Sequence, residues 1–426
     1  MSSTKAAVIR ECRPNLTAYE AVYKKIHANP ELSHCESETA SLIIQHLRGL
    51  SADFEIRAGI GGHGLIAILR NGTGKTVLLR ADIDALPVAE RTGLEYASLR
   101  RQIGSDGKET PVMHACGHDF HAVCLLIAAE TLLRARQFWT GTLVFLFQPA
   151  EEAGDGALGM VNDGLYDSSR HNCPIPDIVL GQHVAPIRAG VVASKNGPIM
   201  SSSDSLKVTI FGRGGHGSMP HRCIDPVVIA SHIVVRLQTI VSRVVPPDEV
   251  AVITVGSIHA GEAENVISDR VFFTVNIRTL DEQVRHTVLD HVRRTITSEC
   301  EAGFCEKGPQ IEHHMSLPVT VNSENAEKKL RQTFAQIFGH EFVVAPKSSL
   351  ASEDFSILAG SIGKPYCFWL FGGIDQQLWD SLAAQGKLDT VPINHSPDFA
   401  PAIHPTLETG GDALVAAALT FLESSP

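Results

Sequence analysis

The chain has 426 residues, 44% of them hydrophobic, and a formal net charge of −11. This length exceeds what one hydrophobic core usually supports, so two domains are expected, and the composition is that of a globular rather than a disordered protein. The acidic balance argues against nucleic acid as a partner, and the absence of an apolar signal core or of about 18 consecutive apolar residues argues against export and membrane insertion.

The first part of the chain predicts helices followed by short strands. Apolar residues have helical spacing from about 17 to 50, with a break at Asn29-Pro30. Two apolar runs, 66–69 and 76–79, flank a stretch that contains NGTG, and this pattern predicts a hairpin of two paired strands. Residues 119–136 again have helical periodicity and end in arginines, which suit a helix C-terminus.

Two further apolar runs predict buried strands. The first, 143–148, ends at Pro149, and the second is 178–184. Strands that alternate with helices in this way predict an α/β fold with a mostly parallel sheet. Ligands of such sheets gather at the carboxyl ends of the strands, which is where Glu151, Glu152 and His183 stand.

A different pattern begins near Ser201 and predicts an inserted α+β domain. Asp225-Pro226 is a good cap and first turn for a helix. The predicted elements are helices at 225–243 and 281–300 and strands at 250–258, 271–279 and 310–317. The inserted domain is placed at 203–316, between two parts of a catalytic domain, 1–202 and 317–426.

The stretch MHACGHDFH (113–121) concentrates residues that bind metals. It contains three histidines, one cysteine and one aspartate just before an apolar helix. Thiolate and imidazole ligands favour zinc or similar metals, and carboxylates extend the choice to manganese or cobalt. Each histidine alone could equally be a capping or core residue, but packing rarely requires such a cluster.

Two acidic motifs follow predicted strands. FQPAEEAGDGA (147–157) contains adjacent glutamates, of which one could bind metal while the other moves a proton as general base. A solvated acidic turn is the alternative. RADIDALP (80–87) offers Asp82 and Asp84, which could accept hydrogen bonds from ligating imidazoles, although an ordinary turn at a strand end is equally compatible with the sequence.

Other catalytic motifs are incomplete. GIGGHG (59–64) and GRGGHG (212–217) match GxGxxG but do not lead from a strand directly into a helix, so neither predicts a dinucleotide site. AGSIG (359–363) lacks the first glycine of a serine nucleophile elbow.

Taken together, these motifs resemble the aminoacylase and carboxypeptidase family of dinuclear metallopeptidases. Within it, the resemblance is to the amidohydrolase subgroup that includes hippurate hydrolases, indole-acetyl amino acid hydrolases and N-acetyl-diaminopimelate deacetylase. The matching motifs run nearly end to end in the family's order, at 27–40, 80–87, 113–121, 147–157, 181–184, 212–221, 264–269, 352–355 and 394–399.

The resemblance implies a zinc-peptidase type of catalytic domain that holds two divalent metal ions, zinc or manganese first, with cobalt or nickel as alternatives. It implies that Glu151 is the catalytic base, with Asp84 in the catalytic set. The implied metal ligands are Cys116, His118, Glu152, His183 and His395.

The inserted domain resembles the family's lid or dimerisation domain. The resemblance implies that His216 polarises the substrate carbonyl, and that Asn265 and Arg278 bind a substrate carboxylate, for which a guanidinium fork is well suited. In the family this histidine often acts across a dimer interface. The sequence departs from the usual pattern at Ser268 and at Gly217-Ser218, positions that affect the lid.

The expected activity is hydrolysis of the amide bond of N-acyl amino acids or small dipeptides. Two alternatives remain open: a relative that acts on a specialised amide in biosynthesis, and a catalytically silent relative that binds ligand. The expected partners are a small-molecule substrate and, through the lid, a second copy of the chain. Nine cysteines without a CxxC pair favour reduced thiols and a cytoplasmic location.

Overall fold

The computed structural model describes residues 5–104 and 107–424, and the chain divides into two compact units. The second unit comprises Met200–Thr320 and Ser348–Glu353, and the first unit comprises the rest of the chain. The sequence predicted the insertion at 203–316 but gave no sign that 348–353 belongs with it. The lid or dimerisation role of this unit stays a prediction.

A nine-stranded sheet forms the centre of the first unit, in the order β1-β2-β6-β3-β7-β18-β8-β17, with β19 paired to β6. Its central strands β6, β3, β7 and β18 are parallel, as the sequence predicted, and antiparallel pairs flank them. The strands are β1 (Glu55–Ile60), β2 (Gly64–Asn71), β3 (Thr76–Asp82), β6 (Trp139–Gln148), β7 (Ile178–Arg188), β8 (Val192–Ser194), β17 (Phe342–Val344), β18 (Tyr366–Ile374) and β19 (Glu423–Ser424).

The predicted hairpin between 66–69 and 76–79 is wrong. Both segments are strands, but β6 lies between them, antiparallel to β2 and parallel to β3. The NGTG turn reverses the chain without joining the two strands by hydrogen bonds. Both strands are buried along most of their length, so each needs partners at both edges, and β6 supplies one edge to each.

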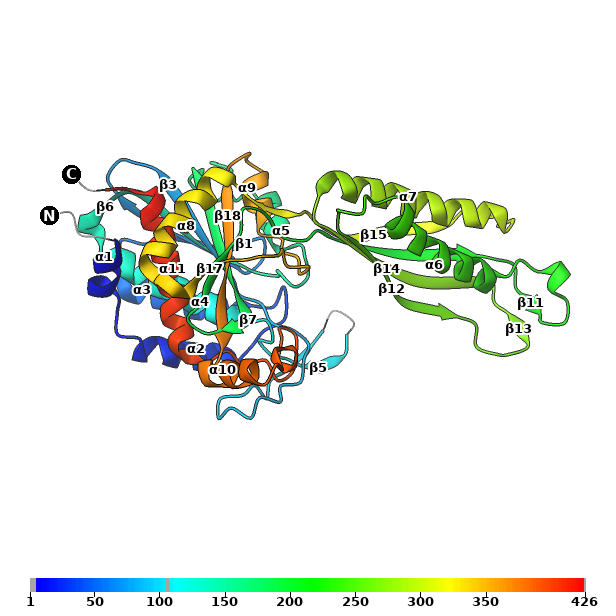
Figure 1. The fold of residues 1–426 in the computed structure, drawn as a ribbon, viewed down its shortest axis with the longest axis horizontal. Helices are drawn as coiled ribbons and strands as arrows, with labels where there is room; N and C mark the ends of the chain where they lie inside the picture. The colour runs from blue at the N-terminus through cyan, green and yellow to red at the C-terminus, as the bar shows by residue number, and fades with distance from the viewer. Residues whose placement is uncertain (1–4, 105–106, 425–426) are drawn as a thin grey trace. The chain divides into compact units, whose positions relative to one another are not determined.

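Helices cover both faces of this sheet. On one face, α4 and α11 pack against each other and against the central strands (Figure 1), and their core includes Phe120, Trp139 and Trp369. On the other face lie the short helices α5 and α9, where Phe355 fills the space left by Gly181 of β7. The helices are α1 (Lys5–Cys12), α2 (Thr17–Ala28), α3 (Ser37–Leu50), α4 (His118–Arg134), α5 (Gly156–Asn162), α8 (Glu324–Phe338), α9 (Ser356–Gly360), α10 (Gln376–Ala384) and α11 (Ile403–Phe421).

The second unit has its own sheet and its own hydrophobic core. The strand order is β12-β14-β10-β15, all antiparallel, and the inward residues of the strands pack with α6 and α7. Asp225 caps α6 by accepting hydrogen bonds from the Val227 and Val228 N–H groups, as its sequence predicted. The elements are β10 (Ser203–Phe211), β11 (Gly215–His216), α6 (Pro226–Arg243), β12 (Ala251–Ala260), β13 (Val266–Ile267), β14 (Arg270–Thr279), α7 (Glu282–Ala302) and β15 (Gln310–Leu317).

Short strands complete the description. They are β4 (Arg101–Ile103) paired with β5 (Glu109–Pro111), β9 (Gly197–Met200) and β16 (Thr320–Asn322). None of the helices in the described part of the chain combines the length and apolar character that crossing a membrane requires.

Candidate metal centre

The parallel strands bring acidic residues and histidines to one edge of the central sheet. β3 ends at Asp82, β6 ends just before Glu151 and Glu152, and β7 carries His183. Because these strands run in the same direction, their carboxyl ends lie together. The N-terminus of α4, with His118 as its first residue, meets the same edge.

A glycine turn places Cys116 and His118 on either side of the start of α4. Gly117 caps the helix with φ +82°, and a Cβ there would collide with the Val184 side chain. Only glycine fits this position without strain. The Asn394 amide donates to the backbone oxygens of Cys116 and Val184, each at 3.2 Å, so the loop before His395 is fastened to both ligand-bearing segments.

The side-chain atoms of the five predicted ligands lie at distances that suit shared metal ions. Cys116 Sγ lies 3.2 Å from His395 Nε2 and 3.4 Å from His183 Nε2. Glu152 Oε1 lies 3.3 Å from His395 Nε2 and 3.8 Å from His118 Nε2. Two ligands of one tetrahedral zinc ion, each at about 2.0–2.3 Å, are separated by roughly 3.3–3.8 Å. The spacing therefore fits a metal centre.

Two buried atoms of this group make no hydrogen bond within the described structure, His118 Nε2 and Glu152 Oε1. The carboxylates of Asp82, Asp84 and Glu152 surround the His118 ring. Burial lowers the pKa of His118, but these three negative charges outweigh burial and raise it to about 10. An anionic, buried site with orphaned ligand atoms is suited to a divalent cation.

The centre is buried on one side and open on the other. His118 and His183 are buried, whereas the His395 side chain is 55% exposed. Burial, together with the charges of His121 and His118, holds the pKa of His183 well below its usual range despite the opposing charge of Asp82. The neutral imidazole is the form that binds metal. The centre is therefore exposed to solvent at His395.

The glutamate pair stands on a tight turn after β6. Glu151 is buried, and one of its carboxylate oxygens lies within 4.8 Å of ligand atoms of His118 and Glu152. Asp84 joins two parts of the centre, since Oδ1 lies 3.2 Å from His118 Nδ1 and Oδ2 accepts the Glu152 N–H at 3.0 Å. The bond to Nδ1 fixes the His118 ring so that Nε2 points into the centre.

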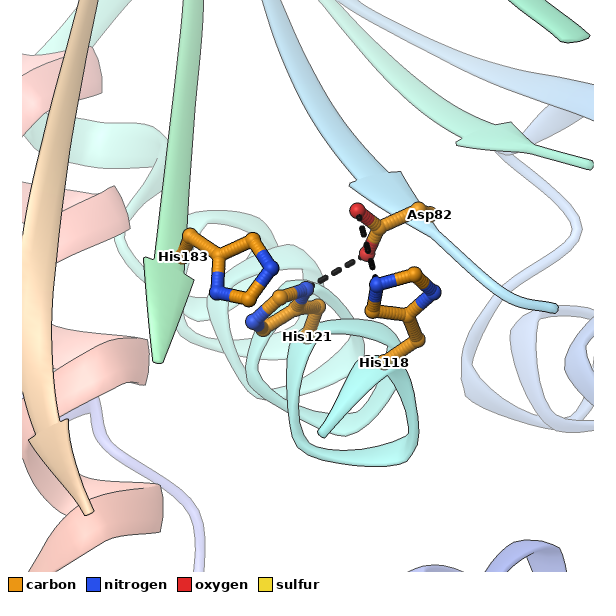
Figure 2. A group of neighbouring side chains, drawn as sticks. All are labelled: Asp82, His118, His121 and His183. Carbon is orange, nitrogen blue, oxygen red and sulfur yellow. Dashed lines mark hydrogen bonds and ion pairs between the residues drawn. The ribbon is translucent and has the colours of Figure 1, made fainter. Parts of the chain in front are cut away.

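Figure 2 shows a second histidine of α4, His121, beside His118 and His183 and bonded to Asp82. His121 Nδ1 lies 2.5 Å from Asp82 Oδ1, and Nε2 accepts the Val184 N–H at 2.8 Å. Both ring nitrogens therefore have partners, so His121 joins α4 to β3 and β7 and is not free to bind metal. From the sequence, His121 was only one histidine of the 113–121 cluster, although its i, i+3 spacing from His118 places both on one helix face.

The three predicted substrate-contacting residues lie in the second unit, and the structure does not bring them all together. His216 and Asn265 are neighbours, because β11 pairs with β13 and the Gly217 N–H donates to Asn265 O at 2.8 Å. Arg278 lies near the far end of β14, eight residues beyond Arg270, which at about 3.3 Å per residue is about 26 Å along the strand. Its guanidinium donates to Leu350 O, Ser352 Oγ and Asn276 Oδ1.

The structure thus gathers the five predicted ligands, Glu151 and Asp84 around one centre, and separates Arg278 from His216 and Asn265. The predicted roles of these residues stay predictions. Arg80, a fully buried cation that bonds Asp82 Oδ2 at 2.8 Å, was likewise not predicted from the sequence as part of the centre. An arginine within an apolar strand was the available signal, because a buried charge requires a partner.

Comparisons with known proteins place this geometry in a family. Residues 78–383 match the family model described as peptidase family M20/M25/M40. An N-acetyl-L-cysteine deacetylase of Bacillus subtilis is 38% identical over 84% of this chain and 81% of its own length. A hippurate hydrolase of Campylobacter jejuni is 37% identical over 82% of this chain and 87% of its own. A crystal structure of a Bacillus subtilis protein, described as a dinuclear metal binding peptidase of the M20 family, has a TM-score of 0.73 and 26% identity, and covers 95% of this chain and 97% of that one.

Proposed function

The chain belongs to peptidase family M20/M25/M40 and is a metal-dependent amidohydrolase or peptidase, and we propose that it hydrolyses the amide bond of N-acyl amino acids. The observation that carries the proposal is the set of five metal-binding side chains with Glu151 beside them. Relatives named for hippurate and for N-acetyl-L-cysteine support an acylated amino acid as the substrate class.

The residues that would hold two divalent ions are Cys116, His118, Glu152, His183 and His395. Zinc or manganese suits this mixture of sulfur, nitrogen and oxygen ligands. Ions held there would polarise the amide carbonyl and lower the pKa of water.

Glu151 is the proposed general base. Its carboxylate takes the proton of the attacking water and then delivers it to the nitrogen of the leaving amino acid. Burial of Glu151 keeps bulk water away from this transfer. Asp84 holds His118 and the Glu152 backbone in place while the reaction proceeds.

The second unit is proposed to supply the contacts to the rest of the substrate. His216 would bond the developing negative charge on the carbonyl oxygen, and Arg278 would bind the free carboxylate. His216 lies on the small β11-β13 sheet just before the start of β14, whereas Arg278 lies near the other end of β14. One copy of the chain therefore does not present both side chains to one small substrate. The proposed homodimer solves this, because His216 and Asn265 of one copy can serve the site of the other.

The substrate class is tested by incubating the metal-loaded protein with N-acetyl, N-benzoyl and indole-acetyl amino acids and following release of the free amine. Release from at least one series, abolished by a chelator and restored by Zn²⁺ or Mn²⁺, is the expected result. No release from any series would refute hydrolysis of N-acyl amino acids and favour the silent or the biosynthetic relative.

The exchange of His216 between copies is tested with two inactive variants, His216→Ala and Glu151→Gln. After mixing and subunit exchange, half of the dimers contain both variants, and each of these has one complete site, so about a quarter of the wild-type activity should return. The unmixed variants are the controls. A mixture that stays inactive although size measurements show exchanged dimers would refute the arrangement.

A further inference from the structure

Residues 27–36 contribute none of the proposed metal ligands, yet their side chains bond to three segments that carry the centre. This 27–36 segment runs from the end of α2 to the residue before α3 and precedes residue 78, where the family match begins. Its sequence, HANPELSHCE, is part of the 27–40 motif, and the proposed reaction gives that motif no role.

Glu36 makes the bond closest to the glutamate pair. Its side chain is fully buried, and Oε1 accepts the N–H groups of Ala150 at 2.8 Å and His34 at 2.9 Å. Ala150 has φ +51° and His34 has φ +67°, a left-handed conformation that residues with a Cβ rarely adopt. One carboxyl oxygen of Glu36 therefore stabilises two turns that have an unfavourable backbone conformation. One of these turns comes immediately before Glu151.

The turn after β6 tolerates little movement. The Gly156 N–H donates to Ala150 O at 3.1 Å, and a Cβ on Gly156 would collide with Pro149 O. If Ala150 relaxed to an ordinary backbone conformation, the direction of the chain would change at the residue that precedes both carboxylates. Small displacements matter here, because metal ligands must be held within a few tenths of an ångström.

Two other residues of the segment reach the centre through one intermediate residue each. Ser33 Oγ donates to Asp84 Oδ2 at 2.7 Å, and Asp84 in turn bonds His118 and the Glu152 N–H. His27 Nδ1 lies 2.7 Å from Asp119 Oδ2, in the first turn of α4. The segment thus contacts the β3 end, the α4 start and the β6 turn.

Burying the carboxyl group of Glu36 at this position costs free energy. Burial and then the charge of Asp84 raise the pKa of Glu36 to about 7. An apolar side chain would avoid this cost, but it would leave the Ala150 N–H without this partner. We therefore attribute the buried carboxyl group of Glu36 to the backbone hydrogen bonds that it accepts.

We propose that the 27–36 segment positions the metal centre, with Glu36 as the positioning residue for the turn that carries Glu151 and Glu152. The inference rests on the proposed function in one respect, that these two glutamates belong to the reacting centre. Glu36 acts through the backbone of Ala150 and touches no reacting atom.

The test compares the affinity for Zn²⁺, measured by competition with a chelator, across matched variants of the full chain. Glu36→Ala should weaken Zn²⁺ binding about 10-fold or more, the lower end of losses typical for groups that support ligands. Glu36→Gln keeps an acceptor oxygen and should stay within about 2-fold of the wild type. Glu38→Ala, which removes an exposed carboxylate paired with Arg100 at the start of α3, is the control and should leave affinity unchanged.

A second change separates positioning from a general loss of stability. Glycine adopts positive φ without strain, so Ala150→Gly in the Glu36→Ala background should recover part of the lost Zn²⁺ affinity. A folded Glu36→Ala protein with unchanged affinity, or a loss that Ala150→Gly does not relieve, would overturn the inference. If circular dichroism shows that Glu36→Ala does not fold, Glu36→Asp decides, because it keeps the charge but withdraws the acceptor by one methylene, and the same loss and recovery are expected.

These measurements also separate the inference from the proposed function. Zn²⁺ affinity does not depend on the choice of substrate. Wild-type protein that binds Zn²⁺ but releases no amine from any N-acyl amino acid would refute the proposed function and leave the positioning role standing. If the wild type hydrolyses N-acyl amino acids but a folded Glu36→Ala variant binds Zn²⁺ with unchanged affinity, the positioning role would be refuted and the proposed function would stand.

Discussion

Glu151 is the residue whose replacement separates catalysis from metal binding most cleanly. Glu151→Gln keeps the size of the side chain and removes its ability to take a proton, so kcat should fall by about 10²–10⁴-fold while the metal content stays unchanged. Steady-state kinetics and elemental analysis of the same preparation measure the two effects. Cys116→Ala, in contrast, removes a proposed ligand and should lower the metal content itself.

Asp155→Asn is the matched control for Glu151→Gln, because it neutralises an exposed carboxylate on the same loop, where Asp155 pairs with His34. We expect its kcat to stay within a few-fold of the wild type. Undiminished turnover by Glu151→Gln would contradict the role of Glu151 as base.

Individual residues of the centre differ in how far the sequence could identify them. Cys116, His118 and Glu151 stand in dense clusters of ligating side chains, which packing alone seldom produces, so their chemistry was visible without a fold. His183 and His395 stand alone in their segments, and only the resemblance to a family marked them. Glu36 was not identified at all, because it bonds a backbone N–H 114 residues away, and the sequence does not indicate which backbone group a side chain will contact.

At the scale of elements, buried polar contacts join α2 to the start of α4. His27 lies at the end of α2, 2.7 Å from Asp119 of α4 and 3.1 Å from Glu90 Oε1. Burial lowers the pKa of His27, but hydrogen bonds and charges of the two carboxylates outweigh burial and raise it to about 9 from 6.5. The ring is therefore charged between two anions at neutral pH.

This contact predicts a pH dependence of stability. Because the pKa of His27 is higher in the folded chain than in the unfolded chain, its contribution is fully present below about pH 6.5 and is lost as the pH rises through about 9. Over this window the free energy of unfolding of the wild type should fall by up to about 3 kcal/mol more than that of His27→Gln. Chemical denaturation of metal-free protein between pH 6 and pH 10 measures it.

His340→Gln is the control for this pH dependence, since the His340 side chain is 93% exposed, and its profile should follow the wild type. Parallel profiles for the wild type and His27→Gln would show that the ion pairs of His27 do not stabilise the fold.

Local patterns identified most elements but not all of their pairings. Helical periodicity predicted α4, α6 and α7, and the Asp225-Pro226 cap also marked the start of α6, since both signals depend on neighbouring residues. The pairing of β2 with β6 rather than β3 depends on a strand about 70 residues later in the chain, and no turn motif reports such a partner. For the same reason, the segment 348–353 could not be assigned to the second unit from its own composition.

At the scale of the whole molecule, the chain has two separate cores but all proposed metal ligands in one unit. The first core includes α4, α11 and the central strands, and the second is formed by α6, α7 and the four-stranded sheet. A ligand stabilises only the structure that binds it, and at a hundredfold excess over its Kd a metal adds about 2.7 kcal/mol. Stabilisation by metal should therefore be unequal between the two units.

Calorimetry of the full chain tests this inequality. We expect two unfolding transitions in metal-free protein, and we expect added Zn²⁺ or Mn²⁺ to raise the midpoint of one by several degrees while the other moves little, because metal ligation does not touch the second core. Substitutions identify the transitions: Ile296→Ala, in the second core, should lower the midpoint that metal leaves unchanged, and Leu125→Ala, in the first core, should lower the other. A single transition that shifts as a whole with metal would instead mean that the two cores unfold as one cooperative unit, so that metal bound in the first also stabilises the second.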